Sequence, residues 1–256
     1  MGQLTDEGYV LRTQPLGDAD LIVSFFTLGH GKLRGVARSA RRSRKRFGSA
    51  LEPLTHVRVA WTDAPGRELV RIEGVENERS FAAMQSEPAL QAACAVISEV
   101  CAAFAHEEQP DPPAFRLVGA VLNALEARVD VATVVRYFEY WMLRIHGLLP
   151  ELDACGRCSA PIVAPEAAYV EAAGQVVCRS CDTAAGHGGR RLGPGELAFF
   201  ADARVHPPDR IAIPQTSARP HGTLEVLLRG TLESFAEARF RSYRHLAAAL
   251  GPGSAG

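Results

Sequence analysis

Two cysteine pairs in the second half of the chain constrain its fold more than any other feature. Both have the spacing CxxC, and 19 residues separate them: Cys155 with Cys158, and Cys178 with Cys181. This spacing is typical of a four-cysteine zinc ribbon. Each tight knuckle brings two thiolates about 3.5–4 Å apart, so four sulfurs at about 2.3 Å can enclose one Zn2+. Because four thiolates leave no open coordination position, the predicted zinc is structural.

Other interpretations of the cysteines and their neighbours are kept open. A redox-active pair of CxxC motifs is one, and replacement of a ligand by His187 is another. Gly156 is expected to relieve the first knuckle turn. The remaining cysteines, Cys94 and Cys101, are expected to be core residues. Seven positions along a helix separate them by about 10 Å, too far for a disulfide.

The chain shows no segment that predicts a membrane span. Its most apolar stretch, residues 88–105, is interrupted by Gln91, Ser98 and Glu99, well short of the roughly 18 apolar residues required. Residues 1–9 carry no basic signal-peptide region. We therefore expect a protein of the reducing cytoplasm, where cysteines bind metal or lie buried rather than form disulfides.

The first third of the chain alternates apolar and polar residues between turn signals, which predicts short strands. Five are expected, at residues 8–14, 20–27, 32–39, 51–62 and 68–77. Five short strands in about 70 residues favour a small closed barrel of the OB type. An SH3-like barrel is the alternative.

From Phe81 onward the apolar spacing becomes helical, so an α+β multidomain protein is expected. Helices are predicted from about Leu90 to Phe104, at 114–128, from an N-cap at Asp130, from Pro194, and at 223–250. The expected division is an OB domain at 1–80, a helical domain in two parts at 81–152 and 190–250, a zinc module at 153–189 and a disordered tail at 251–256.

A cationic segment lies near the front of a chain whose net charge is only −1. Between Asp20 and Glu52 there are eight cations and no acid: Lys32, Arg34, Arg38, Arg41, Arg42, Arg44, Lys45 and Arg46. On its own such a run is often a solvated loop. On the third strand of an OB barrel and in the loop after it, the run predicts a groove that follows a nucleic-acid backbone.

Aromatic residues that could stack on bases are few near this segment. Phe47, and less strongly His30 and Tyr9, are the candidates for stacking. The prediction is therefore an electrostatic mode of binding that favours single strands and discriminates poorly by sequence.

A second basic patch is expected near the end of the last predicted helix, at Arg239, Arg241 and Arg244. Cations at a helix C-terminus are favoured by the helix dipole whatever else they do. A role in binding nucleic acid or protein is therefore the weaker interpretation of this patch.

Motifs for enzymatic chemistry are missing from the sequence. The glycine-rich residues 29–35 match neither a phosphate-binding loop nor a dinucleotide fingerprint. There is also no GxSxG, no HExxH and no two-metal carboxylate pattern. We therefore expect no catalytic residues and no enzyme.

Sequence motifs along nearly the whole chain resemble those of the RecO family of bacterial recombination mediators. They are EGYVLR at 7–12, GDADLIVSFFT at 17–27, GKLRGVARSAR at 31–41, LEPL at 51–54, GLLPEL at 147–152, CGRC at 155–158 and FRSYR at 240–244. Zinc ligands are not universal in that family, and this sequence has all four.

The resemblance implies a non-enzymatic DNA-repair protein. It would bind single- and double-stranded DNA through the cations at 32–46, anneal complementary strands, bind RecR and single-stranded-DNA-binding protein, and help load RecA, without membrane attachment. A nucleic-acid-binding accessory of transcription or RNA metabolism is one alternative. A protein-interaction scaffold for an acidic partner is the other.

Overall fold

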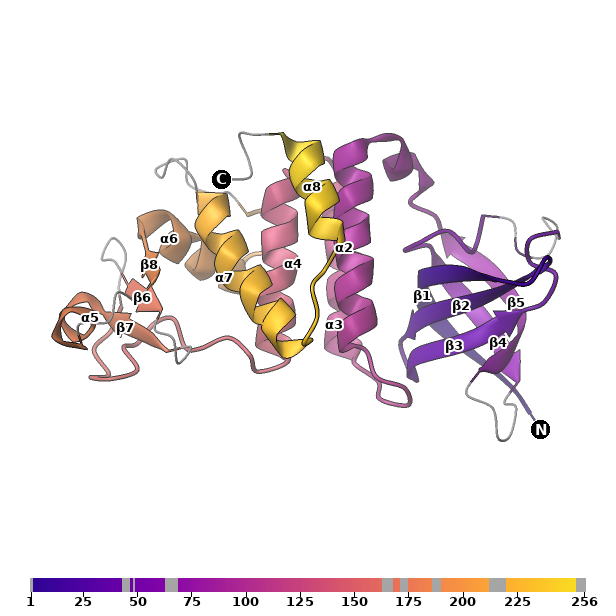
Figure 1. Cartoon of the computed structure of the whole chain (residues 1–256), viewed down its shortest axis with the longest axis horizontal. Helices are drawn as coiled ribbons and strands as arrows, with labels where there is room; N and C mark the ends of the chain where they lie inside the picture. Colours follow the sequence, from indigo (N-terminus) through magenta and orange to yellow (C-terminus); the bar gives the residue numbers. More distant parts are fainter. Residues whose placement is uncertain are drawn as a thin grey trace. The chain divides into compact units, whose positions relative to one another are not determined.

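The computed structural model describes residues 2–42, 47, 49–62, 69–162, 168–170, 175–185, 190–211 and 220–251. The chain divides into two compact units, and Figure 1 labels the helices and strands of both. The first contains residues 1–122 and 239–249, and the second contains residues 123–238 and 250–256. The expected five-part division stays a prediction. Among the described residues, no helix is both long and apolar enough to cross a membrane.

Five strands close into a barrel in the first unit: β1 Gln3–Leu16, β2 Asp20–Thr27, β3 Gly31–Ala37, β4 His56–Thr62 and β5 Val70–Arg79. The strand order is β1-β2-β3-β5-β4, with β4 pairing back onto β1. The β3–β5 pair is parallel and the other pairs are antiparallel. This Greek-key closure confirms the predicted OB-type barrel over the SH3-like alternative.

Alternation along the strands fills the barrel interior with apolar side chains. In β3, Leu33 and Ala37 point inward and are buried, whereas Lys32, Arg34 and Val36 point outward and are half-buried. Gly35 lies where a Cβ atom would come within 2.5 Å of Ile72 Cδ1. The glycine therefore permits the close approach of β3 to β5, where the barrel closes.

Helices cover part of the barrel, and their residues up to Leu122 belong to the same unit. A short 3-10 helix, η1 Ala82–Ser86, precedes α2 Pro88–Phe104, and α3 Pro112–Glu126 follows. The predicted buried stripe of α2 is confirmed, because Leu90, Cys94, Ile97, Cys101 and Phe104 are all buried. The hydroxyl of Ser98 in α2 donates to the Leu11 carbonyl of β1 at 2.5 Å.

The end of the chain forms two helices, so the prediction of one helix over 223–250 is wrong. They are α7 Pro220–Phe235 and α8 Ser242–Leu250. Between them Glu237 adopts a left-handed conformation with φ 48°, which interrupts the helical backbone. The carboxylate of Glu99 then accepts hydrogen bonds from the backbone N–H groups of Arg241 and Ser242, at 3.0 and 2.9 Å. A residue far upstream thus fixes where α8 begins.

The second unit packs α4 Val131–Ile145 against α6 Pro194–Val205 and α7. The predicted N-cap is confirmed, because Asp130 accepts from the backbone N–H of Thr133 at 2.8 Å. This unit also contains a small sheet and a short helix. The sheet is formed by β6 Ala168–Val170, β7 Val176–Cys178 and β8 Arg190–Leu192 in the order β7-β6-β8, and the helix is α5 Arg179–Ala185. Residues 252–256 of the expected tail lie outside the described residues.

Candidate nucleic-acid interface and metal centre

Strand register brings two arginines together on the outer face of the barrel. Arg12 of β1 pairs with Ser24 of β2, and Ser24 pairs with Arg34 of β3. Paired residues share a face and lie about 5 Å apart, so the two guanidinium groups rise from positions about 10 Å apart across three strands. The sequence prediction missed Arg12. The alternation of inward and outward residues along β1 could have indicated Arg12. A bulge between Val10 and Arg12 shifts that alternation by one residue.

The guanidinium of Arg12 is hydrogen-bonded to Gln14, two residues further along the same strand. With the Gln14 amide oriented so that both of its ends have partners, its oxygen accepts from Arg12 Nε at 3.0 Å. This hydrogen bond orients the exposed guanidinium on the outer face of the barrel.

The loop after β3 adds three more described cations at one end of this row. Arg38, Arg41 and Arg42 are exposed. Arg41 ties the loop to the β1–β2 turn, because its backbone N–H donates to the Ala19 carbonyl and its Nη1 donates to the Gly17 carbonyl, at 3.0 and 3.2 Å. In the described part of the chain, Arg34, Arg38 and Arg42 have no ion-pair partner. The barrel cation surface consists of Arg12, Arg34, Arg38, Arg41 and Arg42.

Three predicted DNA-binding residues, Arg44, Lys45 and Arg46, lie outside the described residues.

Lys32 has a structural contact that its sequence position did not suggest. Its ammonium donates to the Ala102 carbonyl in the last turn of α2, at 2.6 Å. That carbonyl has no partner within the helix, and a cation there also complements the helix dipole. Partial burial, and next the nearby Arg34 cation, lower the pKa of Lys32. Lys32 therefore attaches β3 to α2, which separates it from the other predicted DNA contacts.

Replacing Lys32 by methionine is expected to destabilise the barrel unit by about 1 kcal/mol, because a hydrogen bond from a charged group is lost. Urea unfolding followed by the fluorescence of Trp61, which is buried in the barrel, measures this in a Trp141→Phe background. Arg34→Met is the matched control and should leave stability almost unchanged while weakening DNA binding. Equal stability of the two variants would contradict the role given to Lys32.

The stacking residues predicted from the sequence do not form an exposed platform. Phe47 is 3% exposed and belongs to the barrel core, and Tyr9 is 6% exposed beneath Phe115 of α3. His30 is partly exposed, but its Nδ1 lies 2.9 Å from Asp6 Oδ2 and its ring meets the buried Trp61 edge-on. All three residues have packing roles that periodicity alone did not distinguish from surface roles. Binding at this face would therefore depend on charge more than on stacking.

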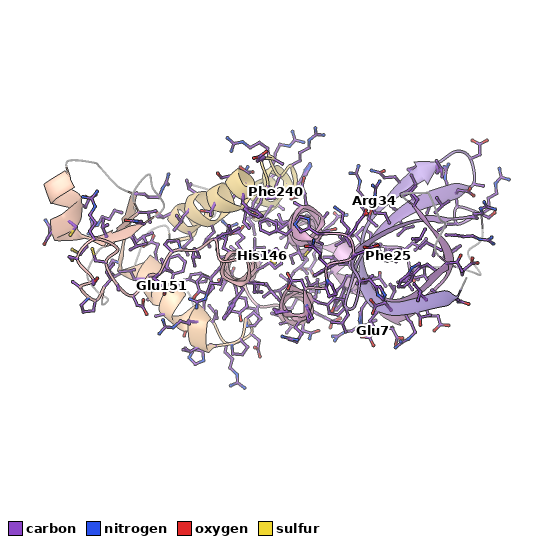
Figure 2. All side chains as sticks on the ribbon, turned by 90° about the horizontal axis from the view of Figure 1, so that it is seen from below. Glu7, Phe25, Arg34, His146, Glu151 and Phe240 are labelled. Atoms are coloured by element: carbon purple, nitrogen blue, oxygen red, sulfur yellow. The ribbon has the colours of Figure 1, made fainter. Side chains whose placement is uncertain are left out.

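Acidic residues lie on a different side of the barrel. Arg58 of β4 sits between Glu7 of β1 and Glu78 of β5, with N···O distances of 3.3 and 3.0 Å. Figure 2 shows Arg34 and Glu7 at opposite edges of the barrel. The barrel therefore has a cationic face and a separate, internally paired acidic face. Such a distribution of charge would direct a polyanion to the first of them.

The second basic patch lies at the start of α8, which corrects its predicted place at a helix C-terminus. Arg239 and Arg241 precede the helix and Arg244 is its third residue. All three are exposed. Their backbone belongs to the first compact unit, together with the barrel.

The four predicted metal ligands converge in the second unit. The sulfurs of Cys155, Cys158, Cys178 and Cys181 all lie within 4.8 Å of one another. The Sγ atoms of Cys158 and Cys178 are 3.8 Å apart. Four sulfurs at about 2.3 Å from a tetrahedral Zn2+ would be about 3.8 Å from each other. The cluster can therefore hold a metal ion, and these four are the only such group among the residues the structure describes.

Backbone N–H groups near the cluster favour the thiolate form of Cys155, which is the form that binds a metal. Burial opposes ionisation of Cys155, but N–H donors of Cys178, Cys158 and Arg157 outweigh it and lower the pKa of the Cys155 thiol to about 6. Hydrogen bonds with Cys158 and then Cys178 raise the pKa of Cys181 to about 12. A divalent ion bound by the four sulfurs would displace the protons of their thiols.

The first knuckle is shaped by a residue other than the one expected. Ser159, with φ 59°, takes the left-handed conformation, and its N–H donates to the Cys155 carbonyl at 2.8 Å. A Cβ on Gly156 would make only ordinary contacts with Gln175 and Val176. The expectation for Gly156 is therefore wrong. His187 lies outside the described residues.

Cys94 and Cys101 are buried free thiols in α2, as expected, and burial raises the pKa of Cys94 to about 12.

Two protein-family models match successive parts of the chain. The family model for the N-terminal part of recombination protein O matches residues 1–81, and the model for its C-terminal part matches residues 85–219. The second match includes all four cysteines of the metal cluster.

Curated relatives named DNA repair protein RecO are similar along much of the chain. The protein of Koribacter versatilis is 40% identical over 152 residues, which are 59% of this chain and 62% of that protein. That of Anaeromyxobacter sp. (strain K) is 34% identical over 68% of each chain. That of Myxococcus xanthus is 31% identical over 89% of this chain and 92% of its own length. The chain therefore belongs to the recombination protein O (RecO) family.

Proposed function

We propose that this protein is a DNA repair and recombination mediator that holds DNA strands by their phosphates. The observation that carries the proposal is the barrel cation surface: five arginines on the outside of the barrel and in the loop after β3, none of which has an ion-pair partner among the described residues. Arginines arranged in this way neutralise phosphates without reading base edges. Such binding suits a protein that must accept any sequence.

The finer steps of the proposal come from the family resemblance. The protein would bind single- and double-stranded DNA, anneal complementary strands, and act with RecR and single-stranded-DNA-binding protein to help load RecA. It would work in the bacterial cytoplasm at the nucleoid, and without catalysing a covalent reaction. Annealing requires that charge repulsion between two strands be reduced while their bases stay free to pair. A cationic face with buried aromatic residues supports that requirement.

The metal of the cysteine cluster is proposed to be one structural Zn2+. Its support is the all-sulfur donor set and the near-tetrahedral spacing of Cys158 and Cys178. Four protein ligands would complete its coordination, so the ion would contribute stability and take no part in a reaction.

Annealing without ATP tests the proposal. Two complementary oligonucleotides carrying a fluorophore and a quencher are mixed with the full-length protein, and the rate of quenching is measured. We expect a clear acceleration over the protein-free reaction, lost when the salt concentration is raised. A scaffold for an acidic protein would leave the rate unchanged. An accessory of RNA metabolism would act on RNA strands in preference to DNA. Either result would overturn the proposal.

A further inference from the structure

The arginines at the start of α8 belong to the same compact unit as the barrel, although Arg239 lies 160 positions after Arg79, the last residue of the barrel strands. Figure 1 shows α8 running beside α2. In Figure 2, Phe240, which lies between Arg239 and Arg241, is on the same edge of the unit as Arg34, opposite Glu7. The C-terminal segment therefore returns to the edge of the unit on which Arg34 lies.

Helix α2 connects the two sets of cations through neighbouring contacts. The Lys32 ammonium, next to Arg34 in β3, donates to the Ala102 carbonyl of α2. Glu99, three residues earlier in α2, accepts from the backbone N–H of Arg241 at 3.0 Å. Three residues of helix correspond to about 4.5 Å along its axis. The β3 cations and the start of α8 are thus anchored within one turn of the same helix.

Helix stability does not account for the cations at this position. Arg241 immediately precedes α8 and Arg244 lies in its first turn, where the helix dipole disfavours positive charge. Glu99 supplies the favourable negative charge, but it does so through the backbone N–H groups. Within the described part of the chain neither guanidinium has an ion-pair partner. Being three residues apart, the two side chains share one side of the turn.

We propose that Arg241 and Arg244 extend the barrel cation surface, so that one DNA backbone contacts both the barrel and the start of α8. The partner is the phosphodiester backbone. This inference rests on the proposed function, because it requires that the barrel cation surface bind DNA. It adds a second contact region, built from the C-terminal end of the chain, that the barrel alone does not provide.

Charge reversal at these two positions tests the inference. Binding of fluorescent oligothymidylate to the full-length protein is titrated at several salt concentrations, for wild type and for Arg241→Glu/Arg244→Glu. Two lost phosphate contacts should reduce the log–log salt slope by about 1.4 and the affinity by roughly tenfold. Arg241→Lys/Arg244→Lys keeps the charge and should bind like wild type. Arg190→Glu/Arg210→Glu makes the same change in net charge at two exposed positions of the other unit.

The outcomes distinguish a failure of the extended surface from a failure of the proposed function. If wild type binds and only the α8 variant loses slope and affinity, the extended surface is supported. If the α8 variant binds like wild type, or loses no more than the Arg190/Arg210 variant, the extension is overturned while the barrel interface stands. If wild type shows no salt-dependent binding, the proposed function itself fails. Trp61 fluorescence confirms in each case that the barrel remains folded.

Discussion

Reversing Arg34, Arg38, Arg41 and Arg42 to glutamate is expected to abolish DNA binding at moderate salt, with a loss of affinity of at least 100-fold. In single strands each neutralised phosphate contributes about 0.7 to the log–log salt slope, so four lost contacts should reduce the slope by nearly 3. The four positions are half-buried or exposed on the open face of the barrel, and none lies in its core.

A matched variant separates charge from shape at the same positions. Changing the four arginines to lysine keeps every positive charge, so most of the affinity and slope should remain if binding is electrostatic. Both variants should retain the buried Trp61 signal. Tight binding by the glutamate variant would exclude this face as the DNA site.

The barrel was predictable because its signals are local. Within β2 and β3 the alternation of inward and outward residues is visible directly in the sequence, and both strands were placed to within two residues. The predicted start of the fourth strand at Leu51 was too early. Leu51 and Leu54 lie in a loop with their side chains buried, and Leu54 has φ 59°. The apolar character of these residues therefore reflects burial and not strand pairing.

The metal ligands were predictable for a similar reason, because the two cysteines of each CxxC pair lie within one turn of the chain. Two other features depend on distant residues and left no local signal. The break between α7 and α8 has no glycine or proline, and α8 begins where Glu99 accepts its backbone N–H groups. Lys32 is attached to Ala102, seventy residues later. Sequence patterns around either residue contain no trace of its partner.

Replacing Cys155 by serine is expected to abolish metal binding and to unfold the module around the cluster. Cys155 is 2% exposed and is the most buried of the four ligands. Its sulfur accepts from the backbone N–H of Cys178 at 3.3 Å, which links the two knuckles. In small zinc domains the metal supplies about 10–16 kcal/mol of apparent binding free energy at neutral pH. A three-cysteine site should not retain enough of it to hold the short strands β6, β7 and β8.

Metal content and local protection are the two measurements for this prediction. Wild type denatured in the presence of a chromogenic chelator should release one equivalent of zinc, and Cys155→Ser should release none. Cys94→Ala removes a buried thiol outside the cluster and should retain the metal. Zinc-free wild type would contradict the proposed ion, and full zinc content in Cys155→Ser would contradict the assigned ligand set.

The effect of metal loss should spread along a defined path within the second unit. The first knuckle is continuous with Asp153, which pairs with Arg204 of α6 at 3.0 Å. Trp141 of α4 donates to the Ala203 carbonyl of the same helix at 3.0 Å. Hydrogen exchange in Cys155→Ser should therefore rise first in β7 and around the knuckle, and then at the end of α6, with Trp141 fluorescence as a second reporter.

The barrel has no residue in this path, so the fluorescence of Trp61 and the salt slope for DNA should keep their wild-type values. A joint loss of metal and barrel stability would show that the zinc module supports the DNA-binding unit, contrary to this prediction.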